Sequence, residues 1–535
     1  MVAVLLALAA GPPADPGPLR DAALTRRGDP AAGKAIFFDT ASARCSVCHK
    51  AGGAGGDVGP DLSHVGGKFD RPHLIEAVLE PSAQIVEGYR ATTLTLADGR
   101  VLTGVVKDQS GDRLTLADAE GKRHTVAAGE VEARRTETVS LMPEGLVRHL
   151  GPDQFADLVA YLESLRPPGQ AKFGAGTAGP ITLPAGFTMS VVATGLTGAT
   201  ALEVAPDRRV FVCEQTGTLR VVKGDRLLPE PFARLPVDSS WERGLIGVTV
   251  APDFPKAPHV FVCYVAAAPY PHHRVSRFTA AGDVAAAGSE VVLLEGDDQR
   301  TLGGTVPNGH QGGALHFGAD GKLYVAVGEQ TAEKPAQRLD SLLGKILRIN
   351  PDGSVPADNP FAARSSGKYR AVWALGLRNP FTFAVQPGTG RVWANDVGGN
   401  KADEVNEVVK GGNYGWPVGE GPTADPRFRG PVHSYPAASI AGAAFAPADL
   451  PWPAGYRGRY FFMDFVHGWV RTLDPGNPGA GPAPFAAGFR RPVDLRFAPD
   501  GGLYVLVRDA WVIDREFRPG TGSLLKIRPP APAGR

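Results

Sequence analysis

Pairs of short apolar strands, each joined by a turn rich in Pro, Gly and Asp, recur through most of the chain after residue 200. Alternation of apolar and polar positions between such turns is typical of β-strands. Six copies of this strand–turn–strand unit occupy residues 201–214, 247–265, 314–329, 382–398, 443–465 and 494–509. Repeats of this kind indicate a radial or solenoid fold, and tight turns between strands favour a propeller. We therefore predict a six-bladed all-β propeller.

The earlier part of the chain carries helical periodicity instead. Asp29-Pro30 predicts the start of one helix, residues 71–80 a second, and Gly151-Pro152 the start of a third. Alternating runs separated by turn residues predict a small β insertion at about residues 88–135. The predicted organisation is a signal-like segment and linker (1–28), a mainly α domain (29–166), a linker (167–181) and the propeller (182–530).

Composition and charge narrow the range of partners. The 535 residues are 43% hydrophobic and 21% charged, with a net charge of +1. This balance gives no long-range attraction to nucleic acid or to an anionic membrane. The run VAVLLALAA after Met1 resembles the apolar region of a signal peptide and is too short to span a bilayer. We expect a periplasmic or secreted protein whose mature chain has no membrane span.

Cys45-Ser46-Val47-Cys48-His49 has the C-x-x-C-H spacing with which c-type haem is attached. The two thiols bond to the haem vinyl groups, and the adjacent imidazole binds the iron. A zinc site and a redox C-x-x-C are the alternatives. Zinc would require a second ligand pair, which does not follow, and a thioredoxin-like site would require a βαβ setting. We therefore predict haem c bound through Cys45, Cys48 and His49.

A second iron ligand is expected from Met142 in Ser140-Leu141-Met142-Pro143, the only methionine between the haem motif and the linker. The rival ligands are His64, His73, His124 and His149. A carbonyl in the Gly59-Pro60 loop is placed to accept the His49 N–H and to orient the ring. Elsewhere, Cys213 and Cys263 occupy equivalent positions in neighbouring repeats, and we expect buried thiols there more than a disulfide.

These features together resemble a class I cytochrome c domain. The match is closer to the planctomycete-type haem-binding domain that carries an inserted β segment. It rests on Cys45, Cys48 and His49, the Gly59-Pro60 loop, Met142-Pro143 and the terminal helix DLVAYLESL. The resemblance implies covalent haem, His/Met ligation and electron transfer.

Two clusters in the propeller carry candidate chemistry, each just before a predicted strand. Asn308-Gly309-His310-Gln311-Gly312-Gly313 places an imidazole, a candidate general base, between glycines that allow a ligand to approach. Gly376-Leu377-Arg378-Asn379-Pro380 supplies a planar guanidinium that suits carboxylate or carbonyl oxygens. Loops at one end of a propeller converge over its channel, so both clusters are candidates for a single pocket.

The propeller resembles the soluble glucose/sorbosone (aldose) dehydrogenase family, which uses pyrroloquinoline quinone (PQQ) and Ca²⁺. The similarity is strongest in GLRNPFTFAVQPGTGRVWANDVG (376–398) and DEVNEVVKGGNYGWP (403–417). It implies that His310 is the general base for the C1 hydroxyl and that Arg378 and Asn379 hold the quinone oxygens. It also implies that the Gly398 and Gly399 carbonyls bind Ca²⁺ and that Arg491 holds quinone carboxylates.

The chain departs from the family pattern at four positions. Val493 stands where a second arginine is usual, His467 where a lysine is usual, Gly309 where an acidic residue is usual, and Glu242 where a glutamine is usual.

The leading hypothesis is an exported quinohaemoprotein oxidoreductase. It would oxidise an aldose or related alcohol with PQQ and pass electrons to the fused haem and then to a downstream carrier. The alternative is a non-enzymatic carbohydrate- or protein-binding propeller attached to an electron-relay cytochrome.

Overall fold

The computed structural model describes residues 17–69, 71–83, 85–86, 89–110, 113–166, 180–301, 309–399, 401–508 and 520–530. The chain divides into two compact units, residues 1–175 and 176–535. The hydrophobic run at the N-terminus and most of the predicted linker lie outside the described residues. Within the described ranges, no helix has both the length and the apolar character needed to cross a bilayer.

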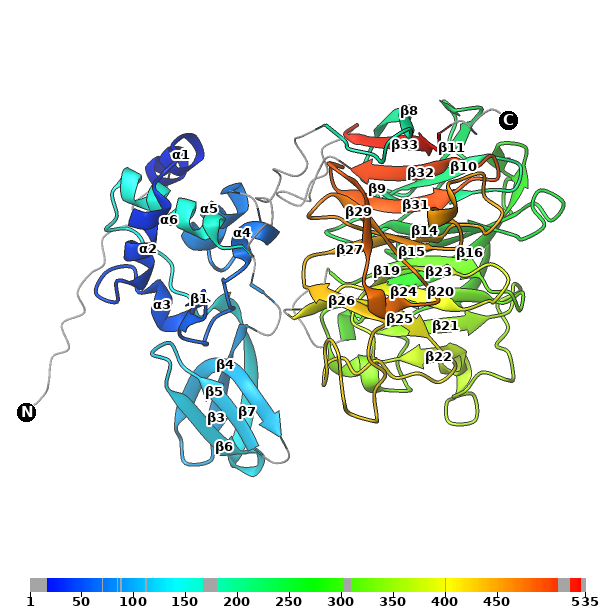
Figure 1. Ribbon diagram of the computed structural model, residues 1–535. Coiled ribbons are helices and arrows are strands. Elements are labelled where there is room, and N and C mark those ends of the chain that lie inside the picture. The colour runs from blue at the N-terminus through cyan, green and yellow to red at the C-terminus, as the bar shows by residue number, and fades with distance from the viewer. Residues whose placement is uncertain are drawn as a thin grey trace, which may run out of the picture. The chain divides into compact units, whose positions relative to one another are not determined.

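The first unit contains six helices and two sheets in its described part (Figure 1). The helices are α1 (Gly17–Thr25), α2 (Pro30–Phe38), α3 (Cys45–Cys48), α4 (Val65–Lys68), α5 (Arg71–Leu79) and α6 (Pro152–Ser164). The five-stranded sheet has the order β6-β5-β4-β3-β7, and β1 (Lys50–Ala51) pairs with β2 (Ala54–Gly55). The five strands are β3 (Arg90–Leu96), β4 (Val101–Ser110), β5 (Arg113–Ala117), β6 (Arg123–Ala127) and β7 (Val131–Ser140).

The three helices predicted here form where the sequence placed them. Asp29 caps α2 by accepting a hydrogen bond from Ala31 N at 2.9 Å. The apolar stripe of α6 is buried against the other helices, and α1, α2, α4 and α5 all contact α6. Burial of this shared apolar surface holds the helices together.

Two expectations for this unit need correction. Residues Gly17–Thr25, assigned to a linker, form α1, because Ala22 and Ala23 can be buried against α6. The β segment extends to Ser140, and strands occupy nearly as much of this unit as helices do. The unit is therefore mixed α and β. Strand β7 extends to Ser140 because it pairs along the whole length of β3.

The second unit is a six-bladed propeller built from six antiparallel sheets in its described part (Figure 1). The first blade contains β9 (Ala199–Val204), β10 (Val210–Glu214), β11 (Thr218–Lys223), β12 (Arg226–Leu227) and β13 (Ala233–Arg234). The second contains β14 (Leu245–Val250), β15 (His259–Ala266), β16 (His272–Ala281), β17 (Val284–Ala285) and β18 (Val291–Glu295). The third contains β19 (Gly312–Phe317), β20 (Leu323–Val327), β21 (Lys345–Ile349) and β22 (Val372–Leu375).

The other three blades complete the ring. The fourth contains β23 (Pro380–Val385), β24 (Val392–Asp396), β25 (Ala402–Val408) and β26 (His433–Pro436). The fifth contains β27 (Ile440–Phe445), β28 (Tyr460–Asp464), β29 (Trp469–Leu473) and β30 (Ala483–Ala487). The sixth contains β31 (Pro492–Phe497), β32 (Leu503–Arg508), β33 (Gly522–Arg528) and β8 (Thr188–Leu196), so it joins strands from both ends of the unit.

The predicted propeller is confirmed, and each repeat corresponds to the two inner strands of a blade. The first strand of each blade contacts the first strand of the next, from β9 around to β31 and back to β9. Six apolar clusters fill the spaces between adjacent blades. Both faces of each blade are therefore buried, which accounts for the long apolar strands in the sequence.

Cys213 and Cys263 are buried and free, which agrees with the preferred prediction. Each thiol packs among apolar side chains, and burial raises the pKa of Cys263 to about 12. Both behave as small apolar core residues.

Candidate functional site

The candidate residues of the propeller gather at one edge, where the first strand of each blade begins and its second strand ends. We call this the site edge. His310 lies two residues before β19, and Glu329 lies two residues after β20, which pairs antiparallel with β19. Arg378 and Gly398 have the same relation to β23 and β24 in the next blade. Antiparallel pairing therefore brings residues from distant parts of the sequence to the same edge.

His310 is held between a carboxylate and a guanidinium. Its Nδ1 lies 2.5 Å from Glu329 Oε1, and its Nε2 lies 2.8 Å from Arg378 Nη2. An arginine only donates hydrogen bonds, so Nε2 accepts, and Nδ1 carries the proton that is donated to Glu329. The structure thus specifies a neutral imidazole with its lone pair on Nε2. A general base needs such a lone pair to accept a proton.

Glu329 is fully buried and fixes the turn that follows β20. Its carboxylate accepts hydrogen bonds from Thr331 N at 3.0 Å and from Glu333 N. Burial raises the pKa of Glu329, and the charge of Arg378 and the backbone donors oppose that rise. Sequence reasoning missed this residue, although a carboxylate directly after an apolar strand was a usable signal.

Asp396, the last residue of β24, fixes the backbone at Arg378 and Asn379. Its carboxylate accepts from Arg378 N at 3.0 Å and from Asn379 N at 2.6 Å. Arg378 Nη1 donates to Val397 O at 3.0 Å and to Gly398 O at 2.8 Å. The Asn379 side-chain oxygen accepts from Gly312 N at 3.0 Å, which ties the third blade to the fourth. Arg378 therefore links the candidate base to the candidate calcium-binding carbonyl.

The sequence departure at Gly309 and Glu242 has a structural explanation. The Glu242 side chain lies beside Gly309: a Cβ added there would be 3.4 Å from Glu242 Oε1. Glu242 Oε2 also accepts from His310 N at 2.7 Å. A carboxylate therefore stands next to His310 even though position 309 has no side chain.

The other two departures, Val493 and His467, replace an arginine and a lysine that are usual in the family pattern. Val493 is 2% exposed and belongs to the apolar cluster between the sixth and first blades, so that position faces the core. His467 is half-buried, and its backbone N–H donates to Asp464 at 2.6 Å. Arg491 directly precedes β31 at the site edge and has a φ of +44°.

Backbone strain is concentrated at this edge. Among the described residues other than glycine, six of the nine with positive φ lie there: Trp241, His310, Gln330, Thr331, Glu333 and Arg491. Such conformations are costly for residues with a Cβ and tend to cluster at functional sites. Gly328 shows how closely the chain packs here, because a Cβ at this position would lie 2.0 Å from His310 O.

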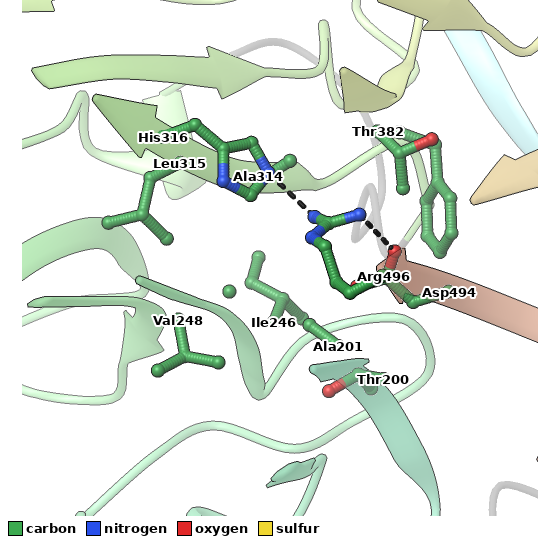
Figure 2. A pocket seen from close by; sticks show the side chains of 12 residues that line it. Thr200, Ala201, Ile246, Val248, Ala314, Leu315, His316, Thr382, Asp494 and Arg496 are labelled. Carbon is green, nitrogen blue, oxygen red and sulfur yellow. Dashed lines mark hydrogen bonds and ion pairs between the residues drawn. The ribbon is translucent and has the colours of Figure 1, made fainter. Parts of the chain in front are cut away.

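A separate polar cluster lies in a small pocket lined by the inner strands (Figure 2). Arg496 donates to Asp494 Oδ1 at 2.8 Å within β31 and to His316 Nε2 at 2.6 Å in the third blade, and both contacts are drawn in Figure 2. Arg496 also donates to Ala443 O at 2.7 Å. These groups satisfy one another and join blades across the ring, so we interpret this cluster as structural.

The first unit places the haem-motif residues in a defined local structure. Cys45 and Cys48 begin and end α3, and both thiols are free. His49 Nδ1 donates to Pro60 O at 2.8 Å, which leaves Nε2 as the atom with a lone pair. Burial lowers the pKa of His49 and so favours the neutral ring that binds metal ions.

The Gly59-Pro60 loop fits closely against this imidazole. A Cβ at position 59 would be 2.4 Å from His49 Cε1, so only glycine allows the loop to lie against the ring. Met142 is half-buried and packs against the same apolar cluster as Cys45. Within the described ranges, no group of three or more His, Cys, Asp or Glu side chains is arranged to hold a metal ion.

Comparison with known proteins bears on the propeller. A profile of the glucose/sorbosone dehydrogenase family matches residues 196–511. The aldose sugar dehydrogenase YliI of Escherichia coli is 32% identical over 248 residues, which cover 44% of this chain and 63% of that protein. The quinoprotein glucose dehydrogenase B of Acinetobacter calcoaceticus is 29% identical over 263 residues, 43% of this chain and 52% of that protein.

A solved structure from Thermus thermophilus, described as a putative oxidoreductase (glucose dehydrogenase), is 32% identical. It aligns over 64% of this chain and 100% of its own length, with a TM-score of 0.56. The family profile covers more than half of the chain and includes every candidate residue at the site edge. This chain therefore belongs to the glucose/sorbosone dehydrogenase family.

Proposed function

We propose that the protein is an exported quinohaemoprotein oxidoreductase that oxidises an aldose or a related alcohol with PQQ and transfers the electrons to a fused haem c. The observation that carries the enzymatic part is the Glu329–His310–Arg378 array, with His310 neutral and its lone pair on Nε2. The names of the relatives, aldose sugar and quinoprotein glucose dehydrogenases, support this substrate class and cofactor.

The residues at the site edge suit a quinone tricarboxylate. Arg378 and Arg491 supply cations, and the strained loops present backbone groups. Bound PQQ would accept a hydride from the substrate carbon. Two carbonyls, of Gly398 and Gly399, are suitable ligands for Ca²⁺, which takes six to eight oxygens and so would draw the others from cofactor and water.

His310 would take the proton from the substrate hydroxyl at Nε2. In the structure this atom accepts from Arg378, so the guanidinium must move to the ligand before the base can act. Glu329 would stabilise the imidazolium that results, through the Nδ1 proton that it already accepts. Binding of the cofactor would therefore draw Arg378 away from His310 Nε2 and free this atom to accept the proton.

The haem assignment rests on Cys45, Cys48 and His49, with Met142 as the proposed second iron ligand. The close fit of Gly59 against the His49 ring and the hydrogen bond to Pro60 O support it, because haem-binding histidines require a fixed orientation. The downstream electron carrier and an exported location belong to the same proposal.

Stopped-flow absorbance tests the complete proposal. Protein produced in an exporting host that attaches haem c should show haem bands, and after loading with PQQ and Ca²⁺ these bands should become reduced on mixing with aldoses. His310→Ala should retain the bands and lose the reduction. A Cys45→Ser/Cys48→Ser variant with an artificial dye as acceptor should retain sugar oxidation without the haem.

Two results would contradict the proposal separately. Protein without covalent haem after such expression would refute the cytochrome. Protein that binds PQQ but reduces neither haem nor dye with any aldose or polyol would support a non-enzymatic binding propeller instead.

A further inference from the structure

Arg508, the last residue of β32, lies beside Arg491 at the site edge. The Arg508 backbone N–H donates to Arg491 O at 3.2 Å, because β31 and β32 are paired antiparallel. The Arg508 side chain reaches across to the first blade, where Nη1 donates to Gln215 Oε1 at 3.1 Å. Two arginines of the sixth blade, one directly before β31 and one at the end of β32, therefore lie side by side at the site edge.

The position of Arg508 is fixed by a chain of hydrogen bonds that leads to the candidate base. Gln215 Nε2 donates to Trp241 O at 2.5 Å and to Arg243 O at 2.6 Å. The Gln215 oxygen is therefore oriented to accept from Arg508. The turn that Gln215 holds carries Glu242, whose carboxylate accepts from His310 N at 2.7 Å.

Electrostatics adds support to this geometry. The pKa of Arg508 is lowered to about 10, because burial and the positive charge of Arg491 disfavour its charged form, while Glu242 acts in the opposite direction. Two neighbouring guanidinium groups in a partly buried position favour the arrival of an anion. A carboxylate is the planar anion that such forks bind in pairs of hydrogen bonds.

Other arginines nearby are less suited to this role. Arg243 pairs with Asp238 at 2.7 Å, Arg471 lies over the Trp469 ring at 4.2 Å, and Arg490 is exposed.

We propose that Arg508 and Arg491 form a carboxylate-binding pair for the quinone cofactor, with Arg508 supplying the cation that the family pattern places at position 493. The inference rests on the proposed function, that the propeller binds PQQ. It assigns a binding role to a residue outside the usual position: the cation comes from the end of the second strand of the blade instead of from within the first.

Binding of PQQ to the metal-replete, cofactor-free protein tests this role without any turnover assay. Isothermal titration calorimetry with Ca²⁺ present should show PQQ bound by Arg508→Gln about 10- to 100-fold more weakly than by the wild-type protein. Arg508→Lys keeps the charge but not the fork, so its affinity should fall between the two. Arg490→Gln is the matched control and should change the affinity by less than about twofold, because exposed charges are screened.

PQQ trimethyl ester, which lacks the three negative charges, identifies the group that Arg508 contacts. The wild-type protein and Arg508→Gln should bind the ester with affinities within about threefold of each other. Circular dichroism establishes that each variant is folded, and Arg508→Lys decides the question if Arg508→Gln is not. If the folded Arg508 variants bind PQQ as tightly as the wild-type protein does, the inference is overturned and the proposed function still stands. Absence of PQQ binding by the wild-type protein would overturn both.

Discussion

His273 holds in place the two segments that carry His310 and Glu329, and we expect acid to lower the free energy of unfolding by protonating it. His273 lies in β16 and is 4% exposed. Its Nδ1 accepts from Gln330 Nε2 at 2.9 Å, so its Nε2 carries the proton that it donates to Gln311 O at 2.8 Å. Gln311 follows His310 in the chain, and Gln330 follows Glu329. One neutral imidazole therefore holds both of the segments, before β19 and after β20, that carry His310 and Glu329.

The magnitude follows from the pKa. Burial, together with the charges of His272 and Arg243, lowers the pKa of His273 to about 4, against about 6.5 in an unfolded chain. Between these values the unfolded state binds the proton and the folded state does not, so stability is lost as the pH falls. The contribution is complete above about pH 6.5, loses about 2 kcal/mol by pH 5, and loses about 3 kcal/mol below pH 4.

Urea unfolding at a series of pH values, followed by tryptophan fluorescence, measures this effect. His273→Gln has no group that titrates in this range, so its free energy of unfolding should decline less steeply than that of the wild-type protein between pH 6.5 and 4.5. The other titrating groups are common to both proteins and cancel in the difference. Parallel declines would refute the reasoning, because they would mean that His273 is not held neutral.

Three further changes should have defined effects. Glu329→Gln keeps an oxygen that can accept the Nδ1 proton but removes the negative charge that would stabilise the His310 imidazolium, and steady-state kinetics on the loaded enzyme should show kcat lower by about 10²- to 10⁴-fold with KM little changed; an unchanged kcat would exclude the proposed role. Gly59→Ala places a Cβ 2.4 Å from His49 Cε1, so haem per chain, measured from the pyridine haemochrome spectrum, should fall, whereas Gly129→Ala, with no atom within 4 Å, should leave it unaltered. Leu347→Ala opens a cavity between the second and third blades at a fully buried position, and urea unfolding should show a loss of about 2–5 kcal/mol; a loss below about 1 kcal/mol would mean that the blades repack.

Local patterns were sufficient for most of the elements. Alternating strands and their turns predicted the blades, because burial on both faces selects apolar residues along every inner strand. The helix that begins at Pro30 was predicted by its capping residue, Asp29. The helix α1 was missed, because its small buried alanines give little periodic signal.

The contacts of the candidate site depended on the tertiary structure. The sequence by itself determined that His310 and Arg378 each precede a strand, but it did not show that Glu329 and Arg378 hold the imidazole from opposite sides. The same holds for Arg508, which lies nearly 300 residues from its partner Gln215 in the chain. The periodicity of a strand encodes which of its side chains are buried, whereas the meeting of loop residues depends on how six blades close into a ring. Ring closure is a property of the whole unit, and only the folded chain decides it.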